Sequence, residues 1–179
     1  MSVLLSIKYI TQMSTTFPTT RPDVGPWDWV RGAVGGFIGS VAFGLMMAFI
    51  MPPPLLEVVI PNMYGFDATP DSPAMLAGWA LHQFHGTVMG LMYVAYVEHP
   101  SVADWFDPRT IGGAIVHGII WGVATTLVFA VIVMPIWLQA VGFPQAPPFP
   151  NIGPATLMST LGHIVYAVPL GLFYAFHRS

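Results

Sequence analysis

Four residues of this chain have types and spacing that suit a chemical site. His82 and His85 are three residues apart, so on a helix they share one face. His163 follows His82 by 81 residues, and Tyr166 follows His85 by the same interval. Two histidines that face each other across a helix bundle are the usual axial pair of a membrane b-type haem. His82 and His163 are therefore candidate haem ligands, with His85 and Tyr166 as a second polar layer.

Two other interpretations of these residues stay open. The histidines would serve as hydrogen-bonding groups between helices, with Tyr166, Gln83 and loop carbonyls as partners. Alternatively, they would contact a quinol or a metal ion. The other deep histidine, His117, lies toward the opposite surface. A shift of 83 residues along the sequence places Val34, not a histidine, on its position. We expect no bound cofactor, keep haem b as the alternative, and assign no residue to a metal site.

The elements that must position these residues are apolar helices. Charged residues are 7% of the chain and hydrophobic residues 55%, whereas ordinary soluble domains have about 25% charged residues. A chain with so few charged residues is expected to lie in a lipid bilayer. A helix needs roughly 20 apolar residues to cross one. We predict an all-α integral membrane protein with four transmembrane helices. These are about Val30 to Met51, Ala74 to Val97, Ile111 to Leu138 and Ala155 to Phe176.

The sequence predicts that the four helices are two copies of one two-helix hairpin. A shift of 83 places Gly35 and Gly39 on Gly118 and Gly122, and Met51-Pro52 on Met134-Pro135. A shift of 81 places His82 on His163, and the two shifts differ within loops, where insertions are tolerated. Repeat 1 is about 30–97 and repeat 2 about 111–177. We expect a tandem duplication with a pseudo-twofold axis along the membrane normal, so 30–179 forms one bundle.

Glycines four residues apart predict close helix packing. Gly35 and Gly39 on the first helix match Gly118 and Gly122 on the third. Small residues at this spacing let helix backbones approach each other, which is how helices associate within lipid. Packing inside the bundle is the favoured role, and oligomerisation through these faces is the alternative.

Basic residues predict the orientation in the membrane. All five, Lys8, Arg21, Arg31, Arg109 and Arg178, fall on one side of the predicted helices. The positive-inside rule then puts both termini in the cytoplasm of a multi-pass protein of the cell membrane. The polar segment 1–29 is expected to be a disordered tail outside the membrane, and Met13 is an alternative translation start to Met1.

The two outer loops, 52–73 and 136–154, are more apolar than solvated loops usually are. Short interfacial helices over Leu55–Ile60 and Ile136–Val141 would explain this composition. A docking surface for other membrane subunits would explain it equally well. We therefore predict the lipid bilayer and other membrane protein subunits as partners, and no nucleic acid.

The chain lacks the common catalytic patterns. It has no cysteine, no phosphate-binding loop, no GxSxG and no HExxH. The predicted spans hold no carboxylate in their interiors, which argues against a proton- or cation-coupled transporter. A non-catalytic accessory subunit is the favoured function. A small b-type cytochrome is the alternative, and a small-molecule permease or channel is a second alternative.

Several segments resemble an uncharacterised family of small four-helix membrane proteins that are common in haloarchaea. They are MPIWLQAVGFPQAPP at 134–148, LGHIVY at 161–166 with LG at 170–171, IPNMYG at 60–65 and AGWALHQFHG at 77–86. Some members are labelled histidine kinases, but this chain has no room for an ATP-binding domain. The resemblance implies the fold, an archaeal cell membrane and an accessory place in a respiratory oxidase or cytochrome bc-type assembly. The chain departs from the family at Ala167 and at Pro169, which should kink the last helix.

Overall fold

The computed structural model describes residues 24–51 and 54–178, so the predicted disorder of the tail lies largely outside the described residues. All regular structure within these ranges is helical, apart from one isolated bridge between Thr69 and Ser72. The helices are α2 (Pro26–Phe49), the π-helix η1 (Leu55–Val59), α3 (Ile60–Asn62), α4 (Met75–Val97), α5 (Pro100–Ala103), α6 (Ile111–Thr125), the π-helix η2 (Thr126–Val133), α7 (Met134–Ala140) and α8 (Pro154–Arg178).

In the described part of the chain, three helices are long and apolar enough to cross a membrane. They are Pro26–Phe49, Ile111–Ala140 and Pro154–His177. The helix α4 is one residue shorter than α2, but it carries His82, Gln83 and His85 close together. These polar side chains lower its mean hydropathy, so composition alone does not identify α4 as a span.

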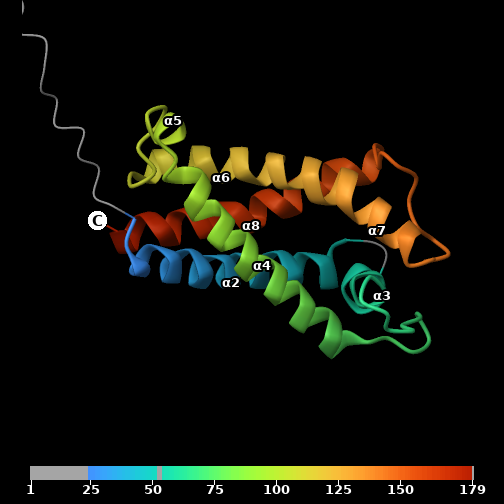
Figure 1. Cartoon of the computed structure of the whole chain (residues 1–179). Coiled ribbons are helices and arrows are strands. Elements are labelled where there is room, and N and C mark those ends of the chain that lie inside the picture. Colours follow the sequence, from blue (N-terminus) through green and yellow to red (C-terminus); the bar gives the residue numbers. More distant parts are fainter. Residues whose placement is uncertain (1–23, 52–53, 179) are drawn as a thin grey trace, which may run out of the picture.

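The long helices pack in a chain of neighbours, α4 on α2, α2 on α8, and α8 on α6. Figure 1 shows α2, α6 and α8 running side by side, while α4 crosses them obliquely. The described chain begins and ends at the end of the bundle where α5 lies, and α3 and α7 lie at the other end. We call these the inner and the outer end.

Glycines allow the central helices to touch. A Cβ on Gly39 of α2 would overlap the carbonyl oxygen of Tyr166 on α8, and one on Gly35 would lie 2.9 Å from Leu170. On α6, Cβ atoms at Gly118 and Gly122 would lie 2.9 and 2.8 Å from the α8 backbone. All four predicted packing glycines therefore lie at contacts with α8.

A second set of glycines sets the path of α4 across α2. A Cβ on Gly36 would overlap the carbonyl oxygen of Gly86, and one on Gly90 would lie 2.8 Å from the Cα of Gly36. This close crossing holds the middle of α4 against α2. The outer part of α4 then diverges from α7 (Figure 1).

Polar residues fix where the spanning helices begin. Pro26 occupies the first turn of α2, and the Asp28 carboxylate accepts a hydrogen bond from the Gly25 backbone at 2.9 Å. At the start of α6, the Thr110 hydroxyl accepts a bond from the Gly113 backbone at 3.0 Å. Because proline and a capping carboxylate favour a helix start, α2 begins at Pro26 rather than at the predicted Val30.

The third helix corrects one prediction for the outer loops. Residues Ile111–Ala140 form one uninterrupted helical rod, so 136–141 belongs largely to this rod and is not a separate interfacial helix. Pro135 does not end the rod, because η2 widens the turn before it and Asn151 satisfies the freed carbonyls. The Asn151 backbone N–H donates to Val131 at 3.1 Å, and its side chain donates to Ala130 at 3.4 Å.

The first hairpin contains a similar arrangement around Pro61. The π-helix η1 precedes this proline, and the Ala74 backbone N–H donates to the Glu57 carbonyl, four residues before it, at 2.9 Å. A glycine with positive φ follows within three residues of the end of α3 and of α7, Gly65 at 82° and Gly142 at 74°. Glycine adopts this conformation without strain, which suits a helix C-terminus. The predicted short helix at 55–60 is thus present, as η1 and the start of α3.

Candidate functional site

A cavity of about 780 Å³ lies between the two hairpins at the outer end. Side chains from α2, α4, η2, α7 and α8 line it, and the segment 141–153 covers part of it. Among the residues that the structure describes, the lining contains no lysine, arginine, aspartate or glutamate, and it includes seven methionines. Cavities of roughly 300–1,000 Å³ with mostly apolar walls are the usual form of small-ligand sites. The seven methionines are Met47, Met51, Met63, Met89, Met92, Met134 and Met158.

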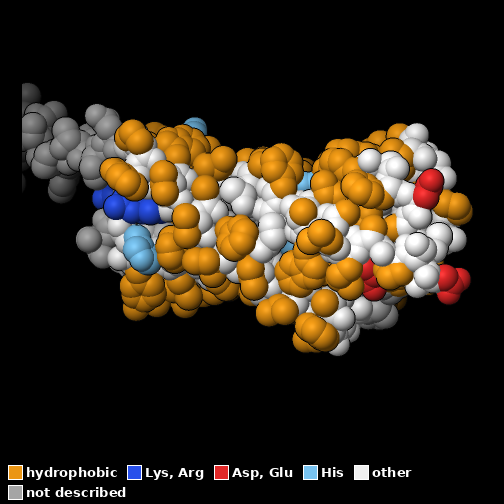
Figure 2. Space-filling model, turned by 90° about the horizontal axis from the view of Figure 1, so that it is seen from below, with side chains coloured by type: hydrophobic (Ala, Val, Ile, Leu, Met, Phe, Trp, Pro, Cys, Tyr) orange, Lys and Arg blue, Asp and Glu red, His pale blue; other side chains and the backbone are white. Residues whose placement is uncertain are grey.

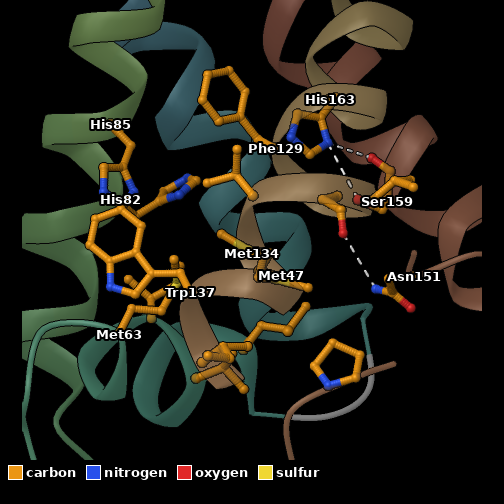
Figure 3. A pocket seen from close by; sticks show the side chains of 18 of the residues that line it. Met47, Met63, His82, His85, Phe129, Met134, Trp137, Asn151, Ser159 and His163 are labelled. Carbon is orange, nitrogen blue, oxygen red and sulfur yellow. Dashed lines mark hydrogen bonds between the residues drawn. The ribbon is translucent and has the colours of Figure 1, made fainter. Parts of the chain in front are cut away.

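All four polar residues of the predicted site lie in the wall of this one cavity: His82, His85, His163 and Tyr166. Figure 3 shows the three histidines around the cavity, His82 and His85 from α4 and His163 from α8. The rings of His82 and His163 both pack against Phe43, with centroids 5.6 and 5.0 Å from its ring. The structure therefore brings together the pair that the repeat relates.

His82 and His163 use different nitrogens to bond backbone carbonyls. The Nε2 of His82 lies 2.9 Å from the carbonyl oxygen of Ser40 on α2. The Nδ1 of His163 lies 2.8 Å from the carbonyl of Ser159, one turn earlier on its own helix. A carbonyl oxygen only accepts, so each of these nitrogens carries the proton. The two histidines are only 7% and 8% exposed.

His85 and Tyr166 are held by hydroxyl groups. The Tyr64 hydroxyl hydrogen-bonds Nε2 of His85, which ties the segment after α3 to α4. Partial burial raises the pKa of Tyr64, so its hydroxyl remains protonated over the ordinary pH range. The Tyr166 hydroxyl donates to the Gly86 carbonyl at 2.8 Å. Tyr166 thus joins α8 to α4 and has no proton left to donate to a ligand.

The geometry fits a bis-histidine haem only in part. An axial histidine commonly donates its Nδ1–H to a carbonyl and binds the metal through Nε2. His163 is arranged in this way, whereas the Nε2 of His82 is bonded to Ser40. The lining also offers no cationic side chain to pair with the two haem carboxylates. Within the described residues, no group of three or more His, Asp or Glu side chains is placed to hold a metal ion.

Several residues of the site were not predicted from the sequence. Phe43 contacts both histidines, Tyr64 bonds His85, and Trp137 lies beside the Tyr64 ring at 5.2 Å. Apolar and aromatic residues of this kind are common throughout the chain, so type and spacing did not distinguish them. Tyr64 and Trp137 had a local signal, because they lie in IPNMYG and MPIWLQAVGFPQAPP, two of the segments on which the resemblance depends.

Comparison of the chain with models of protein families, with curated proteins and with solved structures finds no match. The chemistry of the cavity must therefore be inferred from the side chains that line it. These provide an apolar volume, two buried imidazoles and no formal charge. Such a site suits a neutral, largely apolar ligand.

Proposed function

We propose that the chain crosses the membrane four times, with α4 as the additional span. The support comes from the partners of its polar side chains. His82 donates to the Ser40 carbonyl, and Gln83 accepts from the Ser40 hydroxyl. α2 thus partners one polar atom of each side chain, and every exposed residue of α4 is apolar. Phe84, Val88 and Met92 are 60%, 38% and 44% exposed.

The hydrogen bonds of the outer loops support the proposed duplication. Each hairpin has a π-helix before a proline, and each returning segment donates a backbone N–H to the carbonyl four residues before that proline. A Gly-Phe pair, 65–66 or 142–143, follows the end of α3 and of α7, and its glycine has a positive φ. Equivalent residues of the two loops lie 74 to 77 positions apart in the sequence, whereas equivalent residues of the spans lie 81 or 83 positions apart. Indels between the spans account for the difference.

Charge supports the proposed orientation with both termini inside. On the face in Figure 2, basic side chains lie at the inner end, acidic ones lie at the outer end, and the band between them is hydrophobic. The outer segments 54–74 and 141–153 contain no lysine or arginine. Since short cytoplasmic loops carry the excess of basic residues, the inner end faces the cytoplasm.

Single-cysteine labelling tests the fourth span. Ser72 and Ser101 are exposed residues on either side of α4, and the chain has no native cysteine. A membrane-impermeant maleimide should label Ser72→Cys on intact cells, and Ser101→Cys only after the membrane is opened. Labelling of both variants from the same side would show that α4 does not cross.

For the biochemical role, we propose a non-catalytic subunit of a larger membrane complex. The observation that carries this proposal is the apolar surface of the outer end. Leu76, Ile152 and Leu157 are 85%, 75% and 70% exposed, beside the outer loops. Exposed apolar surface of this kind marks interaction sites. The haloarchaeal resemblance directs the proposal toward an archaeal respiratory oxidase or cytochrome bc-type assembly.

Purification from native membranes in a mild detergent tests this role. We expect a stoichiometric set of membrane subunits, with all haem absorption assignable to them. The variant Ile152→Asp should lose these subunits because a carboxylate replaces an apolar contact. Trp105→Asp is the matched control, because Trp105 is 66% exposed at the inner end and should keep them. A lone chain with its own b-type spectrum would instead establish the cytochrome alternative.

A further inference from the structure

The two buried histidines leave one hydrogen-bond acceptor each. His163 has its proton on Nδ1, which donates to Ser159, so Nε2 carries the lone pair. His82 has its proton on Nε2, which donates to Ser40, so Nδ1 carries the lone pair. Within the described residues these second nitrogens have no hydrogen-bond partner, and both rings line the cavity. In Figure 3 the free nitrogen of His163 points away from Ser159 toward the cavity.

The cavity therefore selects a ligand that donates hydrogen bonds and carries no charge. In the described ranges, 24–51 and 54–178, its lining holds no lysine or arginine, so a phosphate or carboxylate headgroup would be buried without a counter-charge, which is costly. The Phe43 ring packs against both histidines, and Phe129 and Trp137 add further aromatic walls. Aromatic and methionine side chains favour a flat ring between them. A hydroquinone is such a ring, with a hydroxyl donor at each end.

The opening of the cavity suits a ligand that arrives through the membrane. Val88 and Met92 of α4 line the cavity and are also 38% and 44% exposed, and Phe129 of η2 lies in the same wall. The gap therefore opens sideways, between α4 and η2, at the level of the spans. A volume of about 780 Å³ exceeds that of a single ring, so it also accommodates the first part of an apolar tail.

We propose that this cavity binds the reduced headgroup of a membrane quinol. His82 Nδ1 and His163 Nε2 accept hydrogen bonds from its two hydroxyls, and the isoprenoid tail leaves between α4 and η2. Both histidine rings pack against the same side chain, Phe43, with centroids 5.6 and 5.0 Å from its ring, and both line the one cavity. The inference rests on the proposed membrane-spanning fold, but it does not require the partner subunits.

The test is an equilibrium partition of a short-tailed quinol, decyl-hydroquinone, between empty nanodiscs and nanodiscs that contain the purified chain. The oxidised decyl-quinone is the matched ligand, because it only accepts hydrogen bonds. Two hydrogen bonds of about 1 kcal/mol each predict that the quinol binds roughly thirtyfold more tightly than the quinone. His82→Phe and His163→Phe should each lower quinol affinity several-fold and reduce this preference. His99→Phe should change neither, because His99 is exposed at the inner end.

A second variant leaves both histidines in place. Val88→Trp narrows the opening at an exposed position, so it should weaken quinol binding while the protein elutes and melts like the wild type. Equal affinity for quinol and quinone would overturn the proposal, as would full affinity in both histidine variants. Absence of binding to the folded wild-type chain would also overturn it. These results are independent of subunit co-purification, so either proposal can fail without the other.

Discussion

Gly39→Leu is expected to prevent the chain from folding. A Cβ at this position would overlap the Tyr166 carbonyl oxygen and lie 3.0 Å from the Tyr166 ring. A backbone atom cannot move aside as a side chain does, and the contact between α2 and α8 joins the two hairpins. We expect a loss of more than about 4 kcal/mol, a large part of the stability of a typical domain. Circular-dichroism melting and gel filtration in detergent measure this effect.

Gly112→Leu is the matched control for this prediction. A Cβ on Gly112, in the first turn of α6, has no other atom within 4 Å. Replacing a helical glycine there should be neutral or stabilise the helix by up to about 1 kcal/mol. Gly122→Leu should behave like Gly39→Leu, because its Cβ would lie 2.8 Å from Ile164 Cα on α8. Wild-type melting of Gly39→Leu would show that the helices do not meet at this glycine.

The sequence was sufficient to predict the helices and part of their packing. Composition indicates a membrane solvent, and the spacing of Gly35 and Gly39 identifies the α2 face that contacts α8. Gly86 and Gly90 were not assigned to packing in advance, because their partner is the backbone of α2 rather than a matching motif. They decide the path of α4, and so they decide that a cavity exists. A gap between two helices far apart in sequence has no local signal.

The site residues were found by type, but their roles depended on backbone atoms. The predicted repeat places His82 and His163 at equivalent positions, yet one bonds a neighbouring helix and the other bonds its own. This difference determines which nitrogen each presents to the cavity. Carbonyl oxygens are present at every residue, so a sequence cannot show which of them a histidine will reach. Pro135 and Pro61 posed the same difficulty. The carbonyl four residues before each proline bonds the backbone N–H of Asn151 or Ala74, which comes from a loop that is distant in sequence.

His117→Leu is expected to destabilise the inner end of the bundle. No partner of this histidine was predicted from the sequence, but its side chain is fully buried and makes two hydrogen bonds. Its Nε2 donates to the Phe106 carbonyl at 2.8 Å, and its Nδ1 accepts from the Tyr96 hydroxyl at 3.2 Å. With leucine at position 117, the Phe106 carbonyl and the Tyr96 hydroxyl lose this hydrogen-bond partner. The loss should lower the free energy of unfolding by about 2 to 3 kcal/mol. Hydrogen exchange should then rise in the segment 98–110, which His117 anchors.

His99→Leu removes an exposed imidazole from the same end and should leave stability unchanged. Equal unfolding of the two variants would contradict the anchoring role of His117. The ligand assay adds a sharper distinction, because His117 lies outside the cavity lining. Folded His117→Leu should bind decyl-hydroquinone like the wild type, whereas His163→Phe should lose affinity. Opposite responses of the two variants in stability and in binding would separate a structural histidine from one that faces a ligand.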